Sequence, residues 1–223
     1  ADSDLLSRRV YKYSDLSYFL FKEYLENTGG KDLDHLTQEN YYQSLGAHTM
    51  GYKPLSRFAK SKIVPSENDT YWRMQQVHGY VHDMGAAMED NIGGHAGLFS
   101  NANDVAKMMQ MYLQNGYYGG KRYFSKETMN AFNTCYYCKD DVRRGVGFDK
   151  PQLGTVGPTC GCVSMESFGH SGFTGTLTWA DPESGIIYVF LSNRTFPTAD
   201  NRKLISSDLR TRIQEVIENA VIP

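Results

Sequence analysis

Apolar side chains recur at helical spacing near the start of the chain, at Leu16, Phe19, Leu20 and Tyr24. The Thr-Gly-Gly sequence at residues 28–30 follows this run and is typical of a helix C-cap. A second amphipathic stretch covers residues 33–42 and closes at Ser44-Leu45-Gly46. The pattern therefore predicts two successive helices, with Tyr13 just before the first.

The middle of the chain alternates between irregular and helical patterns. A long polar segment with Pro54, Pro65 and Asn68-Asp69 predicts no regular structure. Segments of this length usually carry function or cover a site. A methionine-rich helical pattern then runs over about residues 103–114, until Asn115-Gly116 ends it. We expect its methionines to fill the core.

The last third of the chain is rich in β-forming residues. Residues 174–180 and 186–192 form two such runs, joined by a hairpin loop at residues 181–185. The second run hardly alternates, so both its faces need cover, and we expect helices on both sides of the sheet. A final helix is predicted from one apolar face, made by Ile205, Leu209, Ile213, Val216, Ile217 and Ala220. The simplest organisation is one partial α/β (α+β) domain over residues 1–223.

Charge and hydropathy exclude several classes of partner. The chain has 23 basic and 25 acidic residues, a net charge of -2 and an isoelectric point near 6.3, so nothing indicates binding to nucleic acid or anionic lipid. No apolar run approaches the roughly 20 residues needed to cross a bilayer. Residues 1–10 are polar rather than signal-like, and we interpret them as a cleavage boundary.

The four cysteines form two tight pairs, Cys135 with Cys138 and Cys160 with Cys162. Structural zinc needs two Cys-x-x-Cys-like knuckles, and the second pair is one residue short. We therefore favour disulfides over a metal, with unpaired surface thiols as a further alternative. His78 and His82 have the spacing of helix-borne ligands. Because Gly79 weakens a helix and a metalloprotease Glu is missing, we expect structural roles for both.

Three short motifs follow one another along the chain: Tyr13-Ser14-Asp15, Gly94-His95-Ala96-Gly97-Leu98-Phe99-Ser100 and His170-Ser171-Gly172. Each is weak alone. The alternative interpretation of the first is an aromatic packed at a helix N-terminus, with Ser14 as the cap. For His95, the alternative is a histidine that only ties loop backbone together.

Taken together, these motifs resemble the serine beta-lactamase and penicillin-binding-protein family, in particular its class-C-like esterase and peptidase branch. Tyr13-Ser14-Asp15 resembles the family's Tyr-x-Asn motif, and His170-Ser171-Gly172 stands where the family has Lys-Thr-Gly. Val81-His82-Asp83 and the glycine cluster at residues 93–100 look like two further signatures. The resemblance implies a beta-lactamase/transpeptidase-like fold: an antiparallel sheet flanked by helices, here without its N-terminal strands and nucleophile helix.

The resemblance also implies roles for particular residues. Tyr13 would be the base or proton relay, and Asp15 would pair with the family lysine. His170 would shuttle a proton, while Ser171 would hydrogen-bond the substrate. Gly172 would let the strand edge approach closely, and the Phe173 N–H would be half of an oxyanion hole. His95 and Thr174 would contact substrate, and no cofactor is implied.

The sequence departs from the family pattern in ways that matter. No serine is followed by lysine three positions later, so the nucleophile motif Ser-x-x-Lys is absent. We expect the chain to be truncated and inactive by itself. Asp15 replaces an amide, and His170 replaces a lysine and is mostly neutral at pH 7. Both changes favour cleavage of an ester, an amide or a D-amino-acid peptide related to peptidoglycan over beta-lactam hydrolysis.

A rival function from another class is a non-catalytic module that binds wall peptide or a partner domain. The resemblance further suggests fusion behind a glycoside hydrolase of the beta-N-acetylhexosaminidase kind, and a periplasmic or other extracytoplasmic location. A Ser-x-x-Lys upstream would support the enzyme, and its absence would support the binding module.

Overall fold

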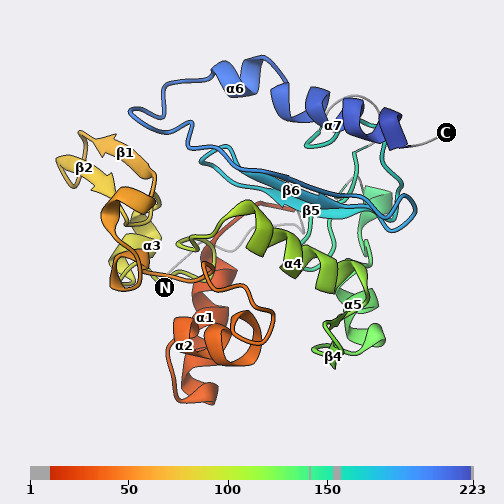
Figure 1. The fold of residues 1–223 in the computed structure, drawn as a ribbon, viewed down its shortest axis with the longest axis horizontal. Coiled ribbons are helices and arrows are strands. Elements are labelled where there is room, and N and C mark those ends of the chain that lie inside the picture. Colours follow the sequence, from red (N-terminus) through yellow and green to blue (C-terminus); the bar gives the residue numbers. More distant parts are fainter. Residues whose placement is uncertain (1–10, 141, 153–156, 222–223) are drawn as a thin grey trace.

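The computed structural model describes residues 11–140, 142–152 and 157–221. A small antiparallel sheet lies between two helices, and a mostly helical region with short hairpins extends from one side of this sandwich (Figure 1). The chain runs through the helical region first and completes the sheet and its outer helix last. No helix among the described residues is long and apolar enough to cross a membrane.

The three-stranded sheet has the order β5-β6-β7, with antiparallel pairing throughout. Its strands are β5 (Phe168–Ser171), β6 (Leu177–Ala180) and β7 (Ile187–Phe190). His170 pairs with Thr178, which in turn pairs with Val189. Because β5 is an edge strand, His170 lies at the margin of the sheet rather than in its middle.

Each face of the sheet is covered by one helix, α4 (Ala102–Leu113) or α7 (Leu209–Val221) (Figure 1). Met109 of α4 packs with Phe168 and Ala180 on one face. On the other face, Ile213 and Ile217 of α7 pack against a cluster of buried side chains, Leu177, Trp179 and Tyr188. The expected double cover of the non-alternating strand is thus confirmed.

The two helices predicted near the start are present. They are α1 (Leu16–Gly29) and α2 (Leu33–Thr37), and α2 continues into a π-helical turn, Gln38–Tyr42. Gly30 ends α1 with a φ of 65°, a left-handed conformation that glycine adopts without strain. The methionine-rich helix α4 is also confirmed, with Met109 and Met111 buried.

The prediction of an irregular polar segment is wrong for part of its length. The structure contains two short 3₁₀ turns, Pro54–Ser56 and Lys60–Lys62, and an antiparallel hairpin of β1 (Pro65–Asp69) and β2 (Gln75–His78). Polar contacts stabilise this hairpin, so its strands show no apolar alternation that would have predicted them. Its main anchor is Arg73, which donates to Asp69 and Glu67 at 2.8 Å each.

Two other predicted boundaries need correction. Residues 174–176 belong to the turn between β5 and β6, since Gly175 has a φ of 98° and β6 begins at Leu177. The predicted final helix is interrupted at Asp208, whose φ is 49°, and so splits into α6 (Lys203–Ser206) and α7. Val216 was predicted on the apolar face but is 69% exposed.

Short elements complete the fold. They are α3 (Met84–Met88), α5 (Lys126–Asn133), a 3₁₀ turn (Cys138–Asp140) and a small hairpin of β3 (Tyr117–Tyr118) and β4 (Lys121–Arg122). Both cysteine pairs are disulfide-bonded, Cys135 to Cys138 and Cys160 to Cys162. The disulfide interpretation of the cysteines is therefore confirmed over zinc and over free thiols.

Candidate active site

A cavity of about 370 Å³ brings together distant parts of the chain. Its walls come from the segment that leads into α1, the glycine loop, residues 144–147 and the edge strand β5. Tyr13, Asp15, His95 and His170 all line it. The first and third sequence motifs thus meet at one cavity, together with the histidine of the second.

Tyr13 lies just before α1, with its ring partly exposed beside the guanidinium of Arg144. The Arg144 Cζ is 4.8 Å from the ring centroid, which is within cation–π range. Burial raises the pKa of Tyr13 above its ordinary value, the charge of Arg144 opposes this rise, and the charge of Asp15 adds to it. In this arrangement the phenol keeps its proton at neutral pH.

The local cap of α1 differs from the alternative interpretation of the motif. Asp15 occupies the N-cap position without a side-chain hydrogen bond, and the Leu16 N–H donates to the Ser14 hydroxyl at 3.3 Å. The cap position therefore falls one residue later than expected, and the side chains of Tyr13 and Asp15 both reach the cavity wall.

His170 is held by its own strand. Its Nδ1 lies 2.8 Å from the Ser171 carbonyl oxygen, so Nδ1–H is the donor and Nε2 is left for proton exchange. Nε2 lies 4.0 Å from Oδ2 of Asp149, a distance that becomes an ion pair when the imidazole is protonated. The ring orientation suits a group that takes up and returns a proton at Nε2.

His95 forms a rigid part of the wall. Its Nε2 lies 2.8 Å from Oδ1 of Asp83, and its ring packs on Phe19 at 4.5 Å between centroids. Burial would raise the pKa of Asp83, but hydrogen bonds from the Ala86 N–H and from His95 lower it below its ordinary value. Asp83 therefore stays charged and anchors the histidine, which is only 5% exposed.

The glycine loop lies directly on the backbone of α1. A Cβ on Gly94 would come within 2.5 Å of the Tyr18 carbonyl oxygen, so only glycine permits this approach. The close contact fixes His95 beside the residues that follow Tyr13. Gly94 thus lets the second motif pack directly against the helix that follows the first motif.

Residues 171–174 lie beyond the set of described residues that line the cavity. The Gly172 N–H donates to the Thr176 carbonyl at 2.8 Å, and the Thr174 carbonyl accepts the Arg194 N–H at 3.0 Å. The Phe173 ring lies 5.1 Å from that of His82. Ser171 therefore ends β5, and Gly172, Phe173 and Thr174 lie in the turn that follows it. The contacts of all four residues with substrate stay predictions.

Sequence reasoning missed Arg144, which lines the cavity, and Asp149, which forms an ion pair with it at 2.7 Å. They lie in the stretch between the two disulfides, which has no hydrophobic period. The signal was weak: two arginines followed by closely spaced glycines, Gly145 and Gly147. Glycine is required at Gly145, because a Cβ there would collide with the Phe132 carbonyl oxygen.

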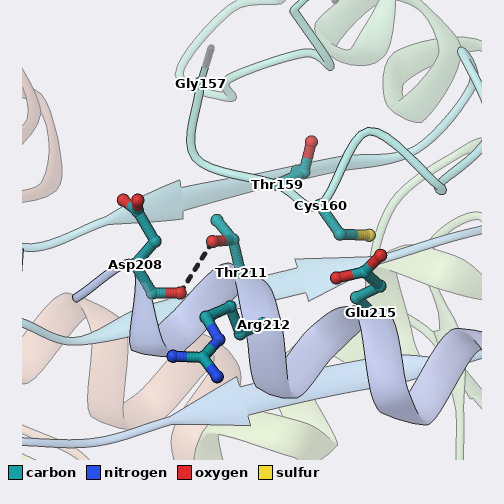
Figure 2. Close-up of a pocket in the computed structure, with 7 residues that line it drawn as sticks. All are labelled: Gly157, Thr159, Cys160, Asp208, Thr211, Arg212 and Glu215. Atoms are coloured by element: carbon teal, nitrogen blue, oxygen red, sulfur yellow. Dashed lines mark hydrogen bonds between the residues drawn. The ribbon is translucent and has the colours of Figure 1, made fainter. Parts of the chain in front are cut away.

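A second cavity, of about 430 Å³, lies between α7 and the loop that carries Thr159 and Cys160 (Figure 2). Asp208, Arg212 and Glu215 give it mixed charge, and the Thr211 hydroxyl donates to the Asp208 carbonyl at 2.8 Å. The cavity is the larger of the two, but it contains no motif residue. The residues of the sequence motifs therefore gather at the cavity of Tyr13 and His170 and not at this one.

Known proteins resemble this chain in sequence and in fold. A family model described as Beta-lactamase matches residues 7–211. An Escherichia coli (strain K12) protein named as a proposed D-alanyl-D-alanine carboxypeptidase is 36% identical over 205 residues, covering 86% of this chain and 47% of that protein. A protein of the same name from Salmonella enteritidis PT4 is 31% identical, with the same coverage. The chain spans about half the length of the curated relatives it matches.

Two solved structures extend the comparison. A beta-lactamase from Mycobacterium bovis has a TM-score of 0.64 at 17% identity, covering 94% of this chain and 64% of that one. A penicillin binding protein from Bacillus halodurans has a TM-score of 0.59 at 16% identity, covering 89% and 56%. Likeness at this identity shows the fold alone, and it confirms the expected beta-lactamase-like arrangement of sheet and helices.

Proposed function

Because this chain belongs to the beta-lactamase family, we propose that it forms the proton-transfer side of a serine hydrolase that cleaves acyl compounds. The single observation that carries the proposal is the common cavity lined by Tyr13 and His170. Acyl transfer needs groups that remove and return protons on either side of the reacting carbonyl. A phenol and an imidazole that line one cavity meet that need.

The proposed nucleophile comes from sequence outside these 223 residues, since no serine here begins a Ser-x-x-Lys motif. The greater length of the curated relatives supports this. So does α1, which has no buried residue and exposes several large apolar side chains, Leu16, Leu20, Phe21, Tyr24 and Leu25. We infer that this face of α1 packs against the segment that carries the serine and its lysine.

That lysine would also complete the environment of Tyr13. Burial raises the pKa of Tyr13 in the chain as described, with Arg144 as the cation that opposes the rise. A second cation beside the phenol would bring its pKa closer to neutrality. The chain alone is therefore proposed to be inactive both for want of a nucleophile and for want of a sufficiently acidic phenol.

The proposed substrates are D-amino-acid peptides, amides or esters of the cell wall. The names of the Escherichia coli and Salmonella relatives support a carboxypeptidase that releases D-alanine. Asp15 and His170 in place of an amide and a lysine support acyl substrates other than beta-lactams. The two disulfides support an oxidising, extracytoplasmic location.

Acylation by a fluorescent penicillin tests the proposal. The longer protein that includes an upstream Ser-x-x-Lys should become labelled, and replacing its serine by alanine should abolish the label. The 223-residue chain should remain unlabelled. Tyr13→Phe in the longer protein should slow acylation by about a hundredfold or more. If the longer protein contains the serine and is not labelled, the non-catalytic binding module, free or fused to a glycoside hydrolase, is the better interpretation.

A further inference from the structure

Arg144 lies in the candidate active site between the tyrosines before α1 and the carboxylate of Asp149. Its Cζ lies 4.8 Å from the ring centroid of Tyr13 and 6.0 Å from that of Tyr11. Its Nη2 lies 2.7 Å from Oδ1 of Asp149. The other carboxylate oxygen of Asp149, Oδ2, lies 4.0 Å from Nε2 of His170. A series of contacts therefore runs from Tyr13 through Arg144 and Asp149 to His170.

Backbone hydrogen bonds fix the positions of Arg144 and Asp149. Arg144 and Asp149 form an antiparallel bridge, and the Gly145 N–H donates to the Phe148 carbonyl at 2.9 Å. Asp149 also exchanges two backbone hydrogen bonds with Gly169, at 2.7 and 3.2 Å. Because Gly169 directly precedes His170 in β5, the carboxylate of Asp149 is fixed to the strand that carries the imidazole.

Arginine suits this position better than lysine would. Its planar guanidinium can lie over an aromatic ring and at the same time donate to a carboxylate in a fixed geometry. The side chain of Asp149 is only 12% exposed and that of Arg144 is 27% exposed, so water screens the pair weakly. The arrangement is therefore more than a surface salt bridge.

We propose that Arg144 and Asp149 are positioning residues that couple the phenol of Tyr13 to the imidazole of His170. Arg144 orients the Tyr13 ring and stabilises its anion, while Asp149 holds Arg144 in place and faces Nε2 of His170. The inference rests on the proposed function, because it treats these two side chains as the proton-transfer pair.

The charges that face Tyr13 predict the direction in which each substitution should shift its pKa. Burial raises the pKa of Tyr13, Arg144 lowers it, and the charges of Asp15, Asp149 and Tyr18 raise it. Loss of Arg144 should therefore shift the pKa of Tyr13 upward. Asparagine in place of Asp149 keeps an oxygen that accepts from Arg144 but removes the negative charge, so it should shift the pKa of Tyr13 downward. General loosening of the fold would move the two variants in the same direction, so opposite shifts would exclude it, and the His170 signals then test the link to the imidazole.

The test is an NMR titration of the 223-residue chain labelled with ¹³Cζ-tyrosine. Tyr13→Phe identifies the Tyr13 signal among the 16 tyrosines. Arg144→Gln should raise its pKa and Asp149→Asn should lower it. Arg143→Gln is the matched control: it removes the same charge from a neighbour whose side chain instead donates to the Pro151 carbonyl, and it should leave the Tyr13 titration unchanged.

A conservative variant and a second signal complete the test. Arg144→Lys keeps the charge but loses the planar guanidinium, so the pKa of Tyr13 should fall between those of wild type and Arg144→Gln, and a pKa equal to that of Arg144→Gln would overturn the proposal. The imidazole ¹⁵N signals of His170 should move in Asp149→Asn and not in Arg143→Gln. Shifts of the same sign in Arg144→Gln and Asp149→Asn would also overturn it. None of these readouts needs turnover, so coupling and hydrolysis fail independently.

Discussion

Glu218 is a buried acid at the contact between α7 and the sheet. It is 1% exposed, and its Oε2 has no hydrogen-bond partner among the described residues. Burial raises the pKa of Glu218 above its ordinary value of 4.5, and the nearby charge of Asp181 adds to the rise. The folded chain thus holds this proton more tightly than the unfolded chain does.

Replacing this acid by its amide should stabilise the fold at neutral pH. A raised carboxyl pKa contributes stability below about pH 4.5 that is lost as pH rises through the folded value. Glu218→Gln removes that loss and should raise the thermal midpoint at pH 7 by about 2–4 °C. The gain should disappear near pH 4. Glu215→Gln, on the exposed side of the same helix, should change nothing in melts followed by circular dichroism.

Some residues of the candidate site could be predicted from the sequence, and others could not. Tyr13 and His170 are recognisable because each sits in a short motif with a fixed order along the chain. Arg144 and Asp149 have no such signal, since their pairing depends on a backbone bridge to β5 that no local pattern encodes. Motifs thus identify the candidate reacting groups, and only the fold identifies the charged groups beside them.

The β1–β2 hairpin depends on Arg73. This side chain is 12% exposed, and it donates to Asp69, Glu67 and the carbonyl oxygens of Val81 and His82. The hydrogen bond from the Arg73 side chain, together with bonds from the backbone N–H groups of residues 71–73, lowers the pKa of Asp69, whose side chain is 1% exposed. Removal of the arginine would leave a buried carboxylate without its charge partner.

Arg73→Met should therefore destabilise the chain by about 3–5 kcal/mol, the cost of breaking a buried ion pair from one side. Urea unfolding monitored by circular dichroism measures the change. Lys53→Met is the matched control, because it removes a basic residue whose partner Asp90 is 81% exposed, and it should cost less than about 1 kcal/mol. A loss for Arg73→Met no larger than that of the control would contradict this role.

Elements with a hydrophobic period were predictable, and those held by polar contacts were not. The spacing of apolar residues correctly predicted α1 and α4, and the unbroken apolar run of β7 predicted cover on both faces of the sheet. The β1–β2 hairpin has no such period. The break between α6 and α7 depends on one left-handed residue, Asp208, for which aspartate is no strong signal.

At the scale of the whole molecule, the two disulfides should matter little for global stability. Each closes a very short loop, with sequence separations of 3 and 2 residues. Short loops remove little entropy from the unfolded chain, about 2 kcal/mol or less each. The chain should therefore remain folded in a thiol reductant, with a thermal midpoint only several degrees lower. Complete unfolding on reduction would contradict this expectation.

Substitutions on the exposed face of α1 test whether this face packs against a segment of the longer protein. Leu20 is 72% exposed and Phe21 is 58% exposed, so charging them removes little packing within the 223 residues beyond the edge-on contact of Phe21 with Tyr18. Leu20→Glu with Phe21→Glu should change the free energy of unfolding of the chain by less than about 0.5 kcal/mol. In the longer protein that carries Ser-x-x-Lys, the same pair should lower stability by several kcal/mol, because two charges would then be buried without partners.

Val216→Glu on α7, where the side chain is 69% exposed, is the control and should be neutral in both proteins. Equal effects of the α1 pair in the short and long proteins would mean that another surface receives the nucleophile segment.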